Sequence, residues 1–315
     1  MTVPDSMIVI QQSELGEADV LTPVSRPVPE PRANEVLVRV RAAGVNPTDW
    51  KHRRTGGFLA DPPFVLGWDV SGEVVALGVG VARFEVGDEV FGMASYPWGH
   101  GTHAEYVALP ARVLVRKPTE IDHVQAGALP LVSLTAWHAL HRYARIEAGQ
   151  RVLVHAAAGG VGHVAVQIAK AAGAEVIGTA SAEKHDFLRS IGVDECIDYR
   201  TQEFDDLVSD VDVVLDTIGG ETSLRSLRVV REGGVVVSTL PTGDDAFMEG
   251  AARLGVRAVR MLVDSSEHEM ELIADLVRRG ELRAHIDRTF PLRDAADAHR
   301  AGETGRTTGK LVLTV

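Results

Sequence analysis

The first third of the chain consists of short stretches in which apolar and polar residues alternate, separated by Gly and Pro. Residues 36–41 alternate in this way, and the segments 71–75 and 87–91 have a similar character. Alternation with a period of two is typical of half-buried strands, and the Gly-Asp pair at 87–88 is a turn signal. The pattern predicts irregular, barrel-like antiparallel β-structure up to about residue 118.

From about residue 120 the pattern changes to near-continuous apolar runs that alternate with segments of helical periodicity. Strands without polar alternation are buried on both faces, as in a parallel sheet covered by helices. We therefore expect an α/β fold with a doubly wound parallel sheet over residues 120–263. Its strands are expected at 151–155, 175–179, 211–216 and 234–238, and its helices at 164–172, 184–190 and 224–231.

The last 50 or so residues return to mixed helix and strand and include the apolar run 310–313. A segment this short buries too little apolar surface to fold alone, so we expect it to pack on the N-terminal domain. A length of 315 residues suits two domains. We predict one domain from residues 1–119 and 264–315 and a second from residues 120–263.

Composition and charge exclude several classes of function. The chain has 32 Lys and Arg against 44 Asp and Glu, a net charge of −12, whereas nucleic acids and anionic membranes require basic surfaces. The single cysteine, Cys196, excludes an internal disulfide framework and a zinc lobe built from paired cysteines. No stretch approaches 18 apolar residues, so we expect no membrane span, and with no signal-peptide pattern a cytoplasmic location is expected.

A glycine-rich segment at residues 155–162 stands where the first parallel strand meets a helix. Glycines there allow a tight turn and close approach to a pyrophosphate, which the helix N-terminus then binds. Ala157 replaces the first glycine of the G-x-G-x-x-G fingerprint, so a plain tight turn is the alternative. The strand–loop–helix context favours dinucleotide binding. The residues expected to contact the dinucleotide are Ala158, Gly159, Gly160 and Val161.

The choice between NADPH and NADH is read at the end of the second strand, where NAD sites carry an acid that binds the ribose 2′-hydroxyl. Here Ser181 stands at that end and Lys184 follows within one helical turn. A hydroxyl and a cation suit a 2′-phosphate and favour NADPH, although Glu183 weakens the signal. The alternative is that Ser181 only caps a helix and Lys184 is solvated.

Ligands of doubly wound sheets bind at the carboxyl ends of the strands. Three further residues at such ends are expected to line the cofactor site: Thr217, Ser238 and Thr239.

Several motifs occur in a fixed order along the chain. They are Ala-Ala-Gly-Val-Asn-Pro-Thr-Asp at 42–49, Leu-Gly-Trp-Asp-Val-Ser-Gly at 66–72, Val-Gly-Asp-Glu-Val at 86–90, Ala-Glu-Tyr-Val at 104–107, Leu-Thr-Ala at 134–136 and the glycine-rich loop at 156–162. Together they resemble the zinc-free quinone oxidoreductase (zeta-crystallin-like) group of the medium-chain dehydrogenase/reductase superfamily, over essentially the whole chain.

The resemblance implies a GroES-like β-barrel catalytic domain plus a Rossmann NADP-binding domain, with the cofactor in the cleft between them. It also implies a homodimer, formed through the edge strand of the Rossmann sheet at about residues 256–263.

Zinc-dependent members of the superfamily carry a cysteine where Asn46 stands and a histidine where Trp68 stands, so the resemblance implies no metal. Without a Lewis acid, alcohol oxidation loses the group that stabilises its alkoxide. A conjugated C=C bond or a quinone can be reduced without metal, because hydrogen bonds stabilise the developing enolate. His100 and His103 have metal-ligand spacing, but we expect them on a surface loop without metal.

The resemblance also assigns roles to single residues. Asn46 would anchor the nicotinamide ribose or the substrate carbonyl, unless its amide merely forms a turn ahead of Pro47. Many quinone reductases have a tyrosine five residues later, whereas this chain has Lys51, in an Asn-Pro-x-Asp-x-Lys stretch that resembles enone and alkenal reductases. Lys51 would donate a proton to the substrate carbonyl, unless it is a solvated member of a basic run.

Three other residues match positions that bind the cofactor in this group. Thr135 would lie beside the nicotinamide, Tyr199 near the 2′-phosphate, and Lys310 in the cleft.

The sequence thus predicts an enzyme, an NADPH-dependent and metal-free reductase that transfers a hydride to an α,β-unsaturated carbonyl or quinone. One alternative is an accessory enoyl reductase of a biosynthetic pathway, acting on a large or tethered substrate. Another is a non-catalytic NADPH-binding protein with a structural or sensing role, which would bind NADPH without consuming it. Substrate choice is expected to depend on the loops at 55–63, 96–103 and 243–255.

Overall fold

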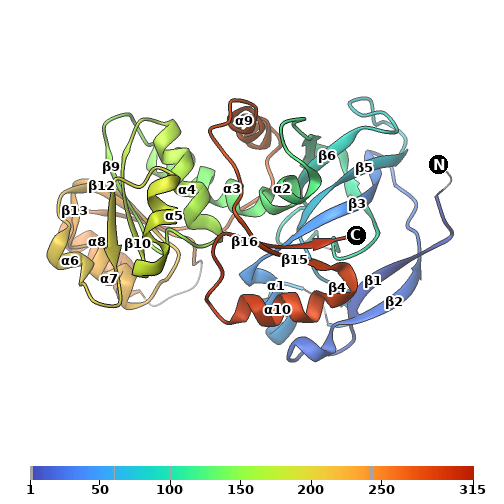
Figure 1. Ribbon diagram of the computed structural model, residues 1–315, viewed down its shortest axis with the longest axis horizontal. Coiled ribbons are helices and arrows are strands. Elements are labelled where there is room, and N and C mark those ends of the chain that lie inside the picture. Colours follow the sequence, from blue (N-terminus) through green and yellow to red (C-terminus); the bar gives the residue numbers. More distant parts are fainter. Residues whose placement is uncertain (1–2, 60, 100, 241–244) are drawn as a thin grey trace. The chain divides into compact units, whose positions relative to one another are not determined.

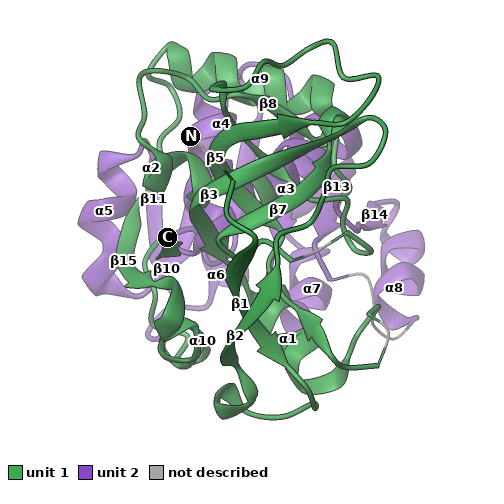
Figure 2. Cartoon of the chain, turned by 90° about the vertical axis from the view of Figure 1, so that its right-hand side faces the viewer, with its two compact units in different colours: residues 1–131, 264–315 green, residues 132–263 purple. Residues whose placement is uncertain are grey.

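The computed structural model describes residues 3–59, 61–99, 101–240 and 245–315, and it falls into two compact units. Unit 1 comprises residues 1–131 and 264–315, and unit 2 comprises residues 132–263 (Figures 1 and 2). Residues 120–131 belong to unit 1, whereas the sequence boundary placed them in the second domain. Within them, helix α2 (His123–Ala128) packs against β3 (Glu35–Val45) and β5 (Asp69–Leu77) of unit 1. The close approach of Gly127 to the Ala42 backbone leaves no room for a side chain there.

Unit 1 is built mainly from antiparallel strands, as the alternating pattern predicts. Its smaller sheet has the order β2-β1-β4, from Thr22–Pro27, Ser6–Gln12 and Phe64–Val65. Its larger sheet has the order β15-β16-β3-β5-β6-β8, with β7 also paired to β3. These strands are Ile286–Pro291, Lys310–Thr314, Glu35–Val45, Asp69–Leu77, Glu89–Met93, Leu114–Arg116 and Tyr106–Pro110. The C-terminal strand β16 pairs with β3, so the end of the chain joins unit 1.

Short helices connect these strands. In unit 1 they are α1 (Pro47–Thr55), α2, α9 (Glu267–Arg278) and α10 (Ala295–Glu303), with single 3₁₀ turns at Ala18–Val20, Ala111–Val113 and Leu292–Asp294. Helix α3 (Pro130–Trp137) continues into a π-helical segment, His138–Ala144. Among the residues that the structure describes, no helix has both the length and the apolar character needed to cross a membrane.

Unit 2 is a parallel sheet in the order β11-β10-β9-β12-β13-β14. Figure 1 labels its strands β9, β10, β12 and β13. Its strands are Glu195–Asp198, Glu175–Ala180, Arg151–Val154, Val211–Asp216, Val230–Ser238 and Arg257–Arg260. Its helices are α4 (Gly160–Ala171), α5 (His185–Ser190), α6 (Phe204–Leu207), α7 (Glu221–Ser226) and α8 (Ala246–Leu254), with a 3₁₀ turn at Ala182–Lys184. After β9 the chain forms β10 on one side of it, and a later strand, β12, pairs with β9 on its other side. The strand order therefore changes direction at β9, and doubly wound sheets bind ligands at such a switch point.

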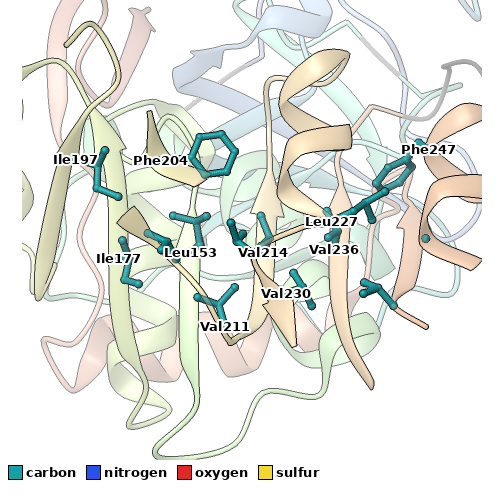
Figure 3. Close-up of a cluster of buried hydrophobic side chains, with 14 residues drawn as sticks. Leu153, Ile177, Ile197, Phe204, Val211, Val214, Leu227, Val230, Val236 and Phe247 are labelled. Atoms are coloured by element: carbon teal, nitrogen blue, oxygen red, sulfur yellow. The ribbon is translucent and has the colours of Figure 1, made fainter. Parts of the chain in front are cut away.

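The core of unit 2 forms because the apolar runs of neighbouring strands are in register. Ile177, Leu153, Val214 and Val236 pair in sequence across β10, β9, β12 and β13. Figure 3 shows this row of side chains, and Phe204 and Phe247 belong to the same buried cluster. Burying aliphatic side chains stabilises the fold by about 1.5–3 kcal/mol each, so this row holds the sheet and its carboxyl edge rigid.

One expected helix is wrong in its bounds. The sequence places a helix at 224–231, but α7 ends at Ser226 and β13 begins at Val230. The Val229 carbonyl accepts a hydrogen bond from Val211, and Val229 is buried. Two adjacent β-branched valines favour an extended backbone, and pairing with β12 overrides the helical spacing.

Candidate functional site

The glycine-rich loop of unit 2 joins β9 to α4 at the carboxyl edge of the sheet. Helix α4 begins after Gly159, and Gly159, Gly160 and Val161 are half-buried while Ala158 is buried. A Cβ added to Gly162 would lie 2.7 Å from the Ala157 Cα and still closer to the Ala156 carbonyl oxygen. The third glycine is therefore required for contact between helix and loop, and the first amides of α4 point toward the edge where an anion can bind.

A hydrogen-bonded network supports this loop from below. His155 is buried, with its ring nitrogens 3.2 Å from the Thr179 hydroxyl and 3.0 Å from the Ser226 hydroxyl. Burial lowers the pKa of His155 to about 4, so the ring is neutral near pH 7. The Ala157 amide donates to the Thr179 carbonyl at 2.9 Å, and the Thr217 hydroxyl donates to the His155 carbonyl at 3.2 Å. The loop is thus held in position by a neutral imidazole ring, by hydroxyl groups and by backbone hydrogen bonds.

The ends of β12 and β13 bring the other expected cofactor residues to the same edge. Ser238 pairs with Asp216 in register, and the Thr239 amide donates to the Asp216 carbonyl at 2.9 Å. The buried Asp216 carboxylate accepts from the Ile218 and Gly219 amides at 2.8 and 3.0 Å and so shapes the turn after Thr217. Because the carboxylate accepts these backbone hydrogen bonds, the candidate ligand contacts at this edge are the hydroxyls of Thr217, Ser238 and Thr239.

The ends of β10 and β11 lie next to each other and place a cation at this edge. Ala180 pairs with Asp198, so Ser181 and Tyr199 follow side by side. Tyr199 is exposed, and the Arg200 guanidinium lies 5.9 Å from the centroid of its ring. Glu183, the acid that weakens the NADPH signal in the sequence, is 3.0 Å from Arg200 in an exposed ion pair. Arg200 is a cation that sequence reasoning missed, and its position directly after Tyr199 was the available signal.

In unit 1, Asn46 stands between β3 and α1. Its backbone is extended, and Pro47 occupies the first helical position, where a missing N–H costs nothing. The backbone N–H of Asn46 donates to Asp49 Oδ2 at 2.6 Å, and the backbone N–H of Asp49 donates to the backbone carbonyl of Asn46 at 2.9 Å. Asp49 therefore holds the turn into α1.

The Asn46 side chain is buried and bound at both ends. Its Nδ2 donates to Asp69 Oδ2 at 2.8 Å, and its Oδ1 accepts from Lys310 Nζ. The Lys310 ammonium also donates to the Val45 carbonyl at 3.0 Å and lies 3.5 Å from Asp69 Oδ2. A lysine ammonium has three N–H donors, and these three acceptors use them all. Lys310 is 2% exposed, so in this structure it orients Asn46 from within the fold.

The charges of this buried cluster do not balance if every group is ionised. Asp49, Asp69 and Lys310 are enclosed together, which gives two carboxyl groups for one ammonium. Burial, together with repulsion from the neighbouring Asp69, raises the pKa of Asp49 to about 8. Burial also raises the pKa of Asp69 and lowers that of Lys310, while attraction between these two opposes both shifts. The cluster is neutral when Asp49 carries a proton and Asp69 pairs with Lys310.

This charge balance predicts a pH dependence of stability that Asp49→Asn removes. A carboxyl whose pKa rises to about 8 on folding stabilises the fold fully below its ordinary pKa of 3.8 and loses that contribution as the pH rises to 8. For one such group the loss is about 1 kcal/mol per pH unit. Urea unfolding from pH 5 to 8 should show this slope for the wild type and a flatter one for Asp49→Asn. Asp194→Asn is the control, because burial does not hold that carboxyl protonated and Lys170 lowers its pKa; equal slopes in all three proteins would refute the assignment.

A pair of hydroxyls lies at the start of α1. Thr48 Oγ1 and the Tyr96 hydroxyl are 3.1 Å apart, and both residues are half-buried. His52 Nδ1 lies 2.8 Å from the Thr48 carbonyl and 3.1 Å from Thr48 Oγ1. Burial raises the pKa of Tyr96, so its hydroxyl keeps its proton at neutral pH. Sequence reasoning missed Tyr96, since nothing in its local pattern shows that it meets α1.

The other expected residues differ in their exposure. Lys51 is on the exposed side of α1, and its carbonyl accepts from the Thr55 hydroxyl at 3.0 Å. Thr135 is buried in α3 of unit 2, one turn before the π-helical segment. Ser181 is buried and precedes the 3₁₀ turn that ends at the half-buried Lys184.

The expectation of a surface loop is wrong for His103. His103 is fully buried, and burial lowers its pKa to about 4; His100 lies outside the described residues. Among the residues that the structure describes, no group of three or more His, Cys, Asp and Glu could hold a metal ion. Trp68 is buried within the fold.

Comparison with known proteins shows likeness over nearly the full length. The family models described as "Alcohol dehydrogenase GroES-like domain" and "Zinc-binding dehydrogenase" match residues 32–119 and 191–313. The NADPH-dependent alkenal/one oxidoreductase of Arabidopsis thaliana chloroplasts is 36% identical, covering 99% of this chain and 80% of the relative.

Two solved structures share the fold. The quinone oxidoreductase of Coxiella burnetii has a TM-score of 0.93 and 38% identity, covering 98% of this chain and 99% of that one. The Escherichia coli quinone oxidoreductase complexed with NADPH has a TM-score of 0.89 and 28% identity, covering 98% of this chain and 100% of that one.

Proposed function

Because this chain belongs to the zinc-free quinone oxidoreductase-like group of the medium-chain dehydrogenase/reductase superfamily, we propose that it is an NADPH-dependent reductase of quinones and α,β-unsaturated carbonyls. The observation that carries the proposal is the loop at the switch point of the parallel sheet, where Gly162 is packed so tightly that a Cβ would lie 2.7 Å from the Ala157 Cα. A dinucleotide fits this cradle, with Gly159, Gly160 and Val161 presenting amides to the pyrophosphate. When bound, a nicotinamide cofactor supplies a hydride.

The chain's own residues would then stabilise the charge that develops on the substrate. Hydride addition to the β-carbon of an enone forms a C–H bond and moves the C=C electron pair toward the carbonyl oxygen. A proton then completes the saturated carbonyl compound, or the hydroquinone when the substrate is a quinone. Hydrogen-bond donors aimed at that oxygen lower the barrier, and the hydroxyls of Thr48 and Tyr96 at the start of α1 are suitable donors.

Two residues are candidates for the proton donor. Lys51 is predicted from the sequence motif, whereas Tyr96 is supported by the contact between its hydroxyl and Thr48 Oγ1. A general acid contributes about 10²–10⁴-fold to a rate. We expect Lys51→Ala to lower kcat in that range with little change in the NADPH dissociation constant if Lys51 is the donor. Tyr96→Phe should lower kcat instead if the phenol is the donor. A loss of NADPH affinity in one of the variants would contradict the donor role of that residue.

Preference for NADPH over NADH is proposed from the groups that follow β10 and β11. Ser181, Lys184 and Arg200 offer a hydroxyl and two cations, while the nearby acid Glu183 pairs with Arg200. We expect Lys184→Ala to raise KM for NADPH at least ten-fold and to change KM for NADH by less than two-fold. Lys170→Ala is the matched control, because that lysine pairs with Asp194 on the surface. Equal changes for both cofactors in Lys184→Ala would remove the phosphate assignment.

Turnover tests the function itself. NADPH oxidation would be measured with a 1,4-quinone, a cyclic enone, a 2-alkenal and a saturated aldehyde. Consumption with the conjugated substrates and none with the saturated aldehyde is the expected result. Tight NADPH binding without consumption would instead favour the sensing or structural role, or a specialised substrate of the enoyl reductase type.

The expected homodimer and cytoplasmic location stay predictions. The observation that favours a dimer is that β14 (Arg257–Arg260) ends the parallel sheet. An exposed strand edge is a ready surface for pairing with a second copy.

A further inference from the structure

A continuous series of rings runs from the core of unit 1 to its surface. Trp68 is fully buried, and its ring centroid lies 5.0 Å from that of His52 and 5.3 Å from that of Tyr96. His52 in turn lies 5.7 Å from Phe58, and Phe58 lies 6.1 Å from Trp98. These spacings fall within the range of attractive ring pairs, so Phe58 packs against the buried His52 ring and Trp98 packs against Phe58.

The series collects rings from three separate segments of a chain that has few of them. Aromatic residues make up 5% of the sequence, with four Trp and four Tyr in total. His52 comes from α1, Phe58 from the loop after it, and Trp68 from the segment between β4 and β5. Tyr96 and Trp98 both follow β6. Two of the four tryptophans, Trp68 and Trp98, thus belong to one series. The loops that carry Phe58 and Trp98 are two of the three loops on which substrate specificity is expected to depend.

The outer pair leaves its apolar surface uncovered. Trp98 is 70% exposed and Phe58 is 40% exposed. Their rings cross at 72°, an edge-to-face arrangement, and both side chains keep exposed apolar surface. A single exposed apolar residue requires no explanation, but adjoining exposed rings that pack onto buried rings are typical of a binding surface.

A polar group of the proposed active site belongs to the same series. Tyr96 contacts Trp68 and His52 through its ring, and its hydroxyl meets Thr48 Oγ1. The surface therefore combines ring faces with a hydrogen-bond donor for a carbonyl oxygen. That combination fits a planar ring in conjugation with a carbonyl group better than it fits a flexible aliphatic chain, which gains nothing from ring stacking.

We propose that Phe58 and Trp98 form the outer part of a substrate subsite for a planar conjugated ring, and that they make the enzyme prefer 1,4-quinones and aryl enones over linear 2-alkenals. The inference rests on the proposed reductase function and identifies the substrate class within it. Each stacked ring contributes about three- to ten-fold to binding beyond the area that it buries. A preference of at least ten-fold in kcat/KM for ring-bearing substrates follows from the two rings together.

The test compares the wild type with the variants Phe58→Ala, Trp98→Ala, the double variant and Trp98→Phe. NADPH oxidation would be measured with a 1,4-naphthoquinone and with a linear 2-alkenal. In the double variant we expect kcat/KM for the quinone to fall at least ten-fold and kcat/KM for the alkenal to change less than two-fold. Trp98→Phe should retain most of the quinone activity, since it keeps a ring. Val79→Ala is the control, because Val79 is exposed and lies outside the series. Equal losses for both substrates would overturn the proposal.

Two further readouts separate this proposal from the function on which it rests. The dissociation constant of the quinone, measured by calorimetry without NADPH, should rise at least ten-fold in the double variant, even if the wild type turns over neither substrate. An unchanged constant would overturn the subsite whatever the activity shows. The molar mass in solution should be the same for the wild type and the double variant. A lower mass for the double variant would identify the rings as an interface between copies and would also overturn the proposal.

Discussion

Replacing Lys310 by Met is expected to lower the free energy of unfolding by about 3–5 kcal/mol, the usual cost of removing one partner of a buried ion pair. The Lys310 ammonium donates to the Val45 carbonyl and to Asn46 Oδ1 and lies 3.5 Å from Asp69 Oδ2. Without it, the fully buried Asp69 carboxyl loses its paired cation. The loss should shrink at low pH, where Asp69 takes up a proton, because burial already raises its pKa.

Urea unfolding at pH 5 and pH 8 measures this effect. Lys170→Ala is the matched control, because its partner Asp194 is 43% exposed and such a pair contributes at most about 1 kcal/mol. The double variant Lys310→Met/Asp69→Leu should recover part of the stability, since it removes the unpaired charge. A loss for Lys310→Met no larger than that of the control, or one independent of pH, would show that the cluster does not bind Asn46 as the structure indicates.

The Gly162→Ala variant is expected to lose at least ten-fold in NADPH affinity and to unfold more easily than the wild type. The added Cβ would lie 2.7 Å from the Ala157 Cα and closer still to the Ala156 carbonyl oxygen. Both are backbone atoms of the cradle, so either the loop or α4 must shift. A shift turns the first amides of α4 away from the pyrophosphate, and the affinity that depends on them falls.

Gly159→Ala provides a control in the same loop. There the added Cβ would lie 3.1 Å from the Ala156 carbonyl oxygen, and the backbone φ of −81° suits any residue. We expect a smaller loss of affinity, measured for both variants by calorimetric titration with NADPH and by the thermal midpoint. Equal affinities for Gly162→Ala and the wild type would remove the loop from the cofactor site.

Much of unit 2 could be predicted because its signals are local. The apolar runs at 151–155 and 211–216 became β9 and β12 almost to the residue, since a strand buried on both faces has no polar positions to confuse its pattern. The glycine-rich loop could be placed for the same reason, because its chemistry lies within eight consecutive residues. Where two local signals competed, as at Val229 and Val230, the helical spacing predicted the wrong element.

The site in unit 1 could be predicted only in part. Asn46 was selected by its motif, but its partners Asp69 and Lys310 are 23 and 264 residues away. The sequence assigned Lys310 to the cofactor because its neighbours resemble a motif, whereas the structure shows its ammonium bound to Val45 and Asn46. Tyr96 and the rings of Phe58 and Trp98 were inside loops expected to choose the substrate, yet nothing local showed that they meet.

By itself, the sequence determined the α/β class, the change of pattern near residue 120, the glycine-rich loop between a strand and a helix and the family, because periodicity and short motifs are carried by neighbouring residues. The tertiary structure decided which groups share a buried environment. It placed Asp49, Asp69 and Lys310 together, which sets their pKa values, and it joined rings from three segments into one surface. These properties depend on distances between residues far apart in the chain, and those distances exist only after the strands of unit 1 have paired.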